Sequence, residues 1–220
     1  MTKTKQTNLI KILISDSIGS VSAKIVEASK PKAVIVLAHG AGAGMEHSFM
    51  EALADALKNK SITTVRYNFP YMENRKGRPD MPAVAEKTVE VVINKAHSLY
   101  PKLPLFVSGK SFGGRMSSQR LSKETPEFVK GIIFVGFPLH PMGAPAITRA
   151  EHLSSIKIPM LFLQGTKDTL ADMALLQPVV KKLKTATLKK FEGADHSFKK
   201  GKIVFIEEIA QEIESWVNSN

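Results

Sequence analysis

The sequence predicts one domain of the α/β class over residues 1–220, with a doubly wound, mostly parallel sheet of about eight strands and helices on both faces. Apolar, β-branched runs recur as continuous stretches, as expected for strands that helices cover on both sides. Segments with helical spacing separate these runs, which favours crossover connections between parallel strands. A hydrophobic content of 43% and a charged content of 23% fit a globular chain.

The expected elements follow one another along the chain. Residues 9–15 and 21–28 flank a turn at Gly19 and predict an opening antiparallel hairpin. Further strands are expected over residues 33–38, 62–69, 105–108, 131–137, 160–163 and 187–191. Helices are expected over residues 46–60, 82–99, 112–122, 172–183 and 203–217. We expect the last helix to face the core with Ile203, Ile206, Ile209, Ile213 and Trp216.

The composition narrows the available chemistry. The chain has no cysteine, which excludes disulfides, thiolate metal sites and a cysteine nucleophile. Catalysis would therefore use hydroxyl, imidazole and carboxylate groups, and we expect no metal and no organic cofactor. The apolar start over residues 9–14 is interrupted by Lys11, and no apolar segment is long enough to cross a bilayer. We expect a cytoplasmic protein without a membrane partner.

The net charge raises a second possibility. A formal charge of +11 would suit a nucleic-acid partner, since basic surfaces attract polyanions. Lysines are spread along the chain, with one denser region over residues 181–202, and no basic run alternates with aromatic residues that could stack on bases. We therefore expect a solvated lysine-rich surface, a small-molecule substrate and no nucleic-acid partner. The pattern indicates no particular oligomeric state.

The pentapeptide over residues 109–113, GKSFG, follows an expected strand and precedes an expected helix. A Gly-x-Ser-x-Gly sequence in that setting is typical of a nucleophile elbow, a strained turn that exposes the serine hydroxyl above the sheet. Glycines at positions 109 and 113 would avoid a collision in the tight turn, and Gly114 would let the helix pack close to the sheet. Ser111 is therefore the expected nucleophile.

A serine nucleophile needs a base and an acid that orients the base. Asp168 follows the expected strand over residues 160–163, and His196 follows the one over residues 187–191. The order Ser, Asp, His accompanies this kind of elbow, and all three residues would meet at the carboxyl edge of the sheet. Asp172 and Asp195 are the alternative acids. Asp172 is expected to cap a helix, and Asp195 adjoins His196, so Asp168 is preferred.

An oxyanion also needs two backbone N–H donors. We expect one from Phe112, directly after the nucleophile, and one from Ala41 in the glycine-rich loop over residues 39–44. A phosphate-binding loop is the alternative. The segment lacks the Gly-Lys-Ser/Thr ending of a P-loop and is only a weak match to a dinucleotide fingerprint.

Several segments along nearly the whole chain form a recognisable set. They are HGAGAGMEHSFM (39–50), RYNFPYM (66–72), GKSFGGRM (109–116), GFPLHPMG (136–143), LQGTKD (163–168) and GADHSF (193–198). The set resembles the dienelactone-hydrolase-related α/β hydrolases, especially the branch that includes a testis-expressed hydrolase-like protein and a subunit of a chromatin acetyltransferase complex. The resemblance implies the α/β-hydrolase fold, triad roles for Ser111, Asp168 and His196, and a site lined by residues 67–72 and 137–141. Dienelactone hydrolases proper carry a cysteine nucleophile, so their substrate is not transferred to this chain.

The connection over residues 137–160 is where hydrolases of this fold often insert a lid. It holds Pro138, Pro141, Gly143 and Pro145 and is too short for a cap domain, so we expect an open or lightly covered site. Possible substrate contacts are His47, Tyr71, Arg115 and His140, with structural roles as the alternative. Arg66, Arg115 and the basic loop over residues 75–78 could hold an anionic group.

These expectations combine into a serine hydrolase that forms an acyl-enzyme from a small carboxylic ester or thioester. A peptide ranks lower as a substrate. The alternative from another class is a non-catalytic binding or scaffold protein that keeps the hydrolase fold without turnover.

Overall fold

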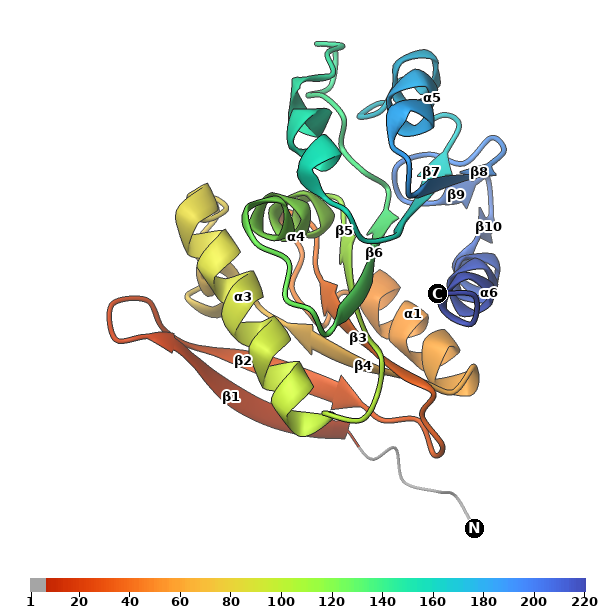
Figure 1. Ribbon diagram of the computed structural model, residues 1–220. Coiled ribbons are helices and arrows are strands. Elements are labelled where there is room, and N and C mark those ends of the chain that lie inside the picture. The colour runs from red at the N-terminus through yellow and green to blue at the C-terminus, as the bar shows by residue number, and fades with distance from the viewer. Residues whose placement is uncertain (1–6) are drawn as a thin grey trace.

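The computed structural model describes residues 7–220, which form a mixed sheet of eight strands in the order β1-β2-β4-β3-β5-β6-β7-β8 (Figure 1). The opening hairpin pairs antiparallel, and β2 also pairs antiparallel with β4, whereas all later neighbours are parallel. The strands are β1 (Thr7–Ser15), β2 (Gly19–Val26), β3 (Ala33–Ala38), β4 (Ile62–Tyr67), β5 (Leu105–Lys110), β6 (Val129–Val135), β7 (Met160–Gly165) and β8 (Ala186–Phe191).

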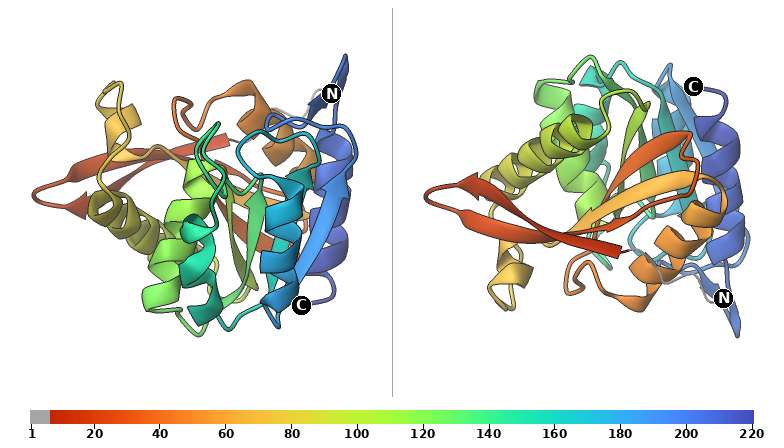
Figure 2. Two further views of the ribbon diagram at one scale, coloured as in Figure 1. Left: turned by 90° about the horizontal axis from the view of Figure 1, so that it is seen from above. Right: turned by 90° about the horizontal axis from the view of Figure 1, so that it is seen from below.

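Helices cover both faces of the sheet, as Figure 2 shows from above and below. One face carries α3 (Pro82–Leu99), α4 (Phe112–Lys123), the 3-10 helix η1 (Thr148–Ser155) and α5 (Met173–Lys182). The other carries α1 (Ser48–Asn59) and α6 (Ile206–Val217). The doubly wound α/β-hydrolase fold is therefore confirmed.

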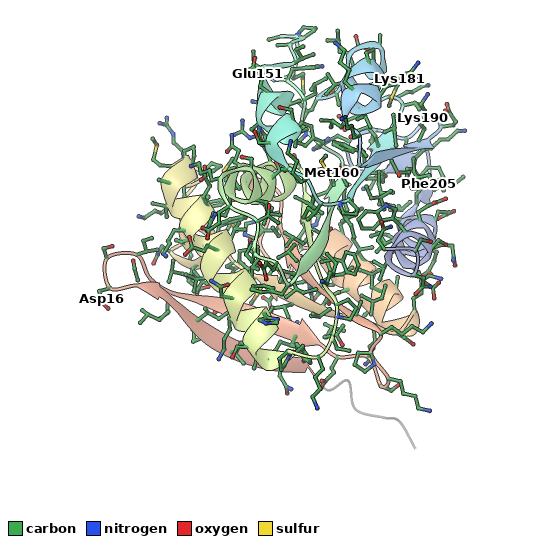
Figure 3. The ribbon with its side chains drawn as sticks, in the orientation of Figure 1. Asp16, Glu151, Met160, Lys181, Lys190 and Phe205 are labelled. Atoms are coloured by element: carbon green, nitrogen blue, oxygen red, sulfur yellow. The ribbon has the colours of Figure 1, made fainter. Side chains whose placement is uncertain are left out.

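The core follows from the continuous apolar strands. All six residues of β3 are buried, and alternate side chains enter opposite layers: Val34 and Val36 pack with the α3 and α4 side, Ile35 and Leu37 with the α1 and α6 side. A strand buried on both faces requires this lack of alternation. Lys181 and Lys190 are exposed, and Figure 3 shows them at the periphery of α5 and β8.

The C-terminal helix begins later than its hydrophobic spacing predicts. Ile203 and Val204 form the short strand β10 (Ile203–Val204), which pairs antiparallel with β9 (Lys199–Lys200). The expected core position of Ile203 is wrong, because its side chain is 54% exposed. Periodicity missed this hairpin because two apolar residues before a helix continue the helical spacing.

Besides β9 and β10, two further short elements are absent from the sequence expectation. Helix α2 (Pro70–Glu73) is one turn that begins with a proline, and η1 lies in the β6–β7 connection. This connection carries η1 against α4 and forms no cap domain within the described residues. None of the helices in residues 7–220 is long and apolar enough to cross a bilayer.

Candidate active site

Ser111 lies between the end of β5 and the start of α4. Its backbone has φ 49° and ψ −113°, a conformation that side-chain-bearing residues rarely adopt. The strained turn is the geometry of a nucleophile elbow, since it lifts the serine above the carboxyl edge of the sheet. The spacing of the GKSFG segment therefore corresponds to the expected strand–turn–helix arrangement.

The glycines of the elbow leave no room for a side chain. A Cβ on Gly109 would lie 2.2 Å from the backbone N of Gly114, which explains the glycine two residues before Ser111. A Cβ on Gly113 would lie 2.6 Å from the carbonyl oxygen of His39 and 2.7 Å from Ala38. Gly113 is therefore dictated by the end of β3, rather than by the collision within the turn that the sequence pattern suggested.

Three side chains from separate loops meet at this edge. Nε2 of His196 lies 2.9 Å from Oγ of Ser111, and Nδ1 of His196 lies 2.6 Å from Oδ2 of Asp168. Because a carboxylate only accepts hydrogen bonds, the arrangement fits the tautomer in which Nδ1–H donates to Asp168 and Nε2 accepts from the serine hydroxyl. The carboxylate is shielded from solvent, while the imidazole is 24% exposed.

Further hydrogen bonds hold the carboxylate of Asp168. Its Oδ1 accepts from the backbone N–H of Leu170, and its Oδ2 also accepts from Nε2 of Gln164 over 2.6 Å. Gln164 is completely buried at the end of β7, and its Oε1 accepts from the backbone N–H of Phe137. Sequence reasoning missed Gln164, although an amide directly after the apolar run of a buried strand is a usable signal.

The two alternative acids have other partners. Asp172 caps α5 by accepting from the backbone N–H of Ala174, as its sequence position predicts. Asp195 accepts from the backbone N–H groups of Ser197 and Lys199 and so stabilises its own turn. Neither carboxylate contacts the imidazole of His196.

The two expected oxyanion donors are the backbone N–H groups of Phe112, which follows Ser111 in the chain, and of Ala41 in the β3–α1 loop. Ala41 lines the same cavity as Ser111, while Phe112 is the first residue of α4. Among the described residues, no acceptor binds the backbone N–H of either residue. Neither N–H group is therefore used by the described part of the chain, as an oxyanion donor requires, although Phe112 itself does not line the cavity.

His39 fixes the loop that contains Ala41. Its Nε2 accepts from the backbone N–H of Phe69, and its Nδ1 lies 2.8 Å from the carbonyl oxygen of Gly40. Burial lowers the pKa of His39 to about 4, which the bond to Gly40 only partly offsets. The imidazole is therefore neutral at neutral pH and ties the β3 loop to the chain after β4.

A cavity of about 700 Å³ opens beside Ser111 and His196. Its lining comes mainly from the β3–α1 loop, α1 and the β9–β10 region, and includes the apolar side chains Phe49, Met50, Leu170, Val204 and Ile206. His47 also lines it, although its imidazole accepts from the backbone N–H of Phe49 and caps α1. Of the four expected substrate contacts, His47 is the one that this cavity includes.

The other three expected contacts have different surroundings. Tyr71 is buried and donates to the carbonyl oxygen of Gly40. His140 is buried, with Nε2 accepting from the backbone N–H of Asp172 and Nδ1 lying 2.9 Å from the carbonyl oxygen of Pro141. None of Tyr71, Arg115 and His140 lines the cavity. Tyr71 and His140 instead form hydrogen bonds with backbone groups of the loops around the site, as most buried polar side chains do.

The arginines considered as anion binders also lie outside this cavity. Arg66 is buried and donates to the carbonyl oxygen of Met45. Burial, together with the nearby Arg149, lowers the pKa of Arg115. The loop over residues 75–78 is exposed. The formally charged side chains that line the cavity are instead Lys110, directly before Ser111, and Lys199, and sequence reasoning missed Lys110.

The fold, together with the residues that meet at the carboxyl edge of the sheet, defines the class of protein as an α/β hydrolase. The chain belongs to the alpha/beta hydrolase domain family, whose model matches residues 31–218. Dienelactone hydrolase from Anabaena variabilis is similar, with 18% identity, 97% coverage of each chain and a TM-score of 0.79. Est1E from Butyrivibrio proteoclasticus has 13% identity, coverage of 96% and 98%, and a TM-score of 0.75.

A third similar structure is relevant to the β6–β7 connection, which forms no cap domain within the described residues. XC6422 from Xanthomonas campestris, described as a serine hydrolase without a lid, has 18% identity, coverage of 99% and 94%, and a TM-score of 0.69. At these identities the likenesses establish the fold. The dienelactone-hydrolase-like assignment made from the sequence motifs is confirmed by the family match and these neighbours.

Proposed function

We propose that this protein is a serine hydrolase that cleaves a small carboxylic ester or thioester through an acyl-enzyme. The observation that carries the proposal is the continuous hydrogen-bonded series from Ser111 through His196 to Asp168, with separations of 2.9 and 2.6 Å. A serine hydroxyl is a weak nucleophile at neutral pH, and this arrangement gives it a base whose tautomer is fixed.

The reaction proceeds in two steps. Nε2 of His196 takes the proton of Ser111 while Oγ attacks the carbonyl carbon, and the N–H groups of Ala41 and Phe112 stabilise the oxyanion. The imidazolium then protonates the leaving alcohol or thiol as the C–O or C–S bond breaks. Water, deprotonated by His196, hydrolyses the acyl-enzyme and regenerates the serine hydroxyl.

The cavity favours a small acyl compound over a polymer. A volume of about 700 Å³ lies within the range of small-molecule sites, and its walls are largely apolar. Without a cap domain, substrate would reach Ser111 directly from solvent. Similar structures described as esterases, from Rhodothermus marinus and Pyrococcus furiosus, support this substrate class.

Labelling with a fluorophosphonate probe tests the proposal. The wild type, Ser111→Ala and His196→Ala are compared, and peptide mass spectrometry locates the adduct. Labelling confined to Ser111 and dependent on His196, together with Ser111-dependent hydrolysis of short-chain esters, is the expected result. A folded wild type that neither labels nor hydrolyses esters would contradict the proposal and favour the scaffold alternative.

A further inference from the structure

The charges that line the cavity are of one sign. Its formally charged residues are Lys110 and Lys199, and no Asp or Glu lines it among the described residues. Lys199 is exposed at the start of β9, whereas Lys110 is largely buried beside Ser111. A cavity with apolar walls and only cationic side chains is electrostatically complementary to an anionic ligand.

The ammonium group of Lys110 is held at a defined position. Nζ donates to the carbonyl oxygen of His196 over 2.7 Å and lies 5.6 and 5.9 Å from the ring centroids of Phe198 and Phe49. Gly136 leaves space for it, since a Cβ there would lie 3.2 Å from Nζ. The position is therefore set by a hydrogen bond, two aromatic rings and a glycine.

This cation lacks a counter-ion within the described chain. Lys110 forms no ion pair there, and its one hydrogen-bond acceptor is the His196 carbonyl, so two of its three donors remain without a protein acceptor. The two carboxylates whose charges act on Lys110 are already engaged: Asp168 binds His196 and Gln164, and Asp195 binds its own turn. Burying a charge without a partner is unfavourable, and a ligand carboxylate would supply the partner.

We propose that Lys110 is a specificity residue that binds a carboxylate on the substrate, so that the preferred substrate is an ester or thioester carrying a second, anionic carboxyl group. This inference rests on the proposed function for its cleavage step. It assigns Lys110 no proton transfer: the ammonium donates hydrogen bonds to the carboxylate, while Ser111 and His196 carry out the chemistry on the ester.

Matched substrate pairs test the proposal. Monoethyl adipate carries the carboxylate on the acyl side, and its control is the same ester with a carboxamide in place of the carboxylate. The butyrate ester of ω-hydroxyhexanoate carries the carboxylate on the alcohol side, with the corresponding amide as control. We expect the wild type to favour the charged member of at least one pair by about tenfold or more in kcat/KM, the range for a hydrogen bond to a charged group.

Variants separate substrate binding from support of the His196 loop. Lys110→Met and Lys110→Gln are expected to bring the charged-to-neutral ratio close to one, with Gln keeping a donor near the His196 carbonyl. Lys95→Met removes the same charge from the exposed surface of α3 and should keep the wild-type ratio. An equal loss for both members of each pair in Lys110→Met, or a wild-type ratio of one in both pairs, would overturn the proposal.

A binding measurement is independent of turnover. Calorimetry with adipate on Ser111→Ala, compared with the Ser111→Ala Lys110→Met double variant, reports carboxylate binding alone. Loss of binding on removing Lys110 supports the proposal even if no ester is cleaved, whereas equal or absent binding in both proteins counts against it. Thermal unfolding of each variant verifies that the fold is intact.

Discussion

The side-chain amide of Gln164 donates a hydrogen bond of 2.6 Å to Oδ2 of Asp168, the same oxygen that lies 2.6 Å from Nδ1 of His196. The other end of the amide accepts from the backbone N–H of Phe137. Gln164 thus connects the carboxylate to the segment that follows β6. It belongs to β7, all of whose residues are buried. Two neighbouring strands therefore determine the orientation of one carboxylate.

Replacing Gln164 with leucine should impair both stability and turnover. The N–H of Phe137 loses its acceptor in a buried position, which costs about 1–3 kcal/mol in the free energy of unfolding. Freed rotation of Asp168 should lower kcat by up to about a hundredfold, because small misplacements of catalytic groups are costly. Denaturant unfolding and ester hydrolysis measure the two effects. Gln177→Leu on the exposed face of α5 is the control, and equal kcat values in both variants would contradict the assigned role.

The choice of Asp168 over its neighbours can be tested with isosteric amides. Asp168→Asn should lower kcat by roughly ten-thousandfold, the size of effect found when a triad carboxylate becomes an amide and the imidazole adopts the wrong tautomer. Asp172→Asn should keep nearly all activity, since asparagine also caps helices well. Steady-state kinetics on one ester compares them. A small effect at Asp168 with a large one at Asp195→Asn would reassign the acid.

The elements that the sequence predicts well are those whose signals are local. Continuous apolar runs locate β3 and β5, and the strand–GKSFG–helix pattern locates the turn at Ser111. Meeting of Ser111, Asp168 and His196 follows from a topological rule, because parallel strands bring their carboxyl ends to one edge. The acid could be chosen in advance because Asp172 has the position of a helix cap.

The features that the sequence does not predict depend on where side chains point, and this is decided by contacts between segments far apart in the chain. Tyr71 and His140 lie in segments near the site, but their side chains are buried in loop-stabilising hydrogen bonds. The Gly-x-Ser-x-Gly pattern assigns no role to Lys110, which occupies an x position, and its surroundings include Phe49 and Phe198 from distant segments. Ile203 continued a helical spacing that β10 interrupts.

Gly113 should not tolerate a side chain. In Gly113→Ala the new Cβ would meet backbone and Cβ atoms at the end of β3 within 2.7 Å, and backbone cannot yield as a flexible side chain can. We expect a loss of about 3 kcal/mol or more in unfolding free energy. Gly77→Ala is the matched control, since no atom lies within 4 Å of the position that its Cβ would take. Similar thermal midpoints for the two variants would contradict this account of the elbow.

The free energy of unfolding should fall in mild acid because His39 is buried. Its pKa is lowered by burial from 6.5 to about 4, so the unfolded chain binds the proton more readily than the folded one between these values. The contribution is fully present above pH about 6.5 and decreases as the pH falls, reaching a loss of about 2 kcal/mol at pH about 5. Burial lowers the pKa of His152 to about 4 as well, which adds in the same direction. Urea unfolding at pH about 7.5 and about 5 measures the difference, and His39→Leu should reduce it, whatever its effect on absolute stability.

The preference for a charged substrate should itself depend on pH. Burial lowers the pKa of Lys110 to about 8, although the charges of Asp168 and Asp195 partly offset this effect. The ammonium is therefore present below pH about 8 and lost above it, so the ratio of kcat/KM for monoethyl adipate over its amide should be highest below that pH and decline above it. His196 acts on both substrates in the same way, so its contribution cancels in the ratio, and Lys199, the other cation lining the cavity, is exposed. Lys110→Met should give a flat ratio across the same range. A wild-type ratio that stays constant from pH about 6.5 to about 9.5 would mean that this ammonium does not select the substrate.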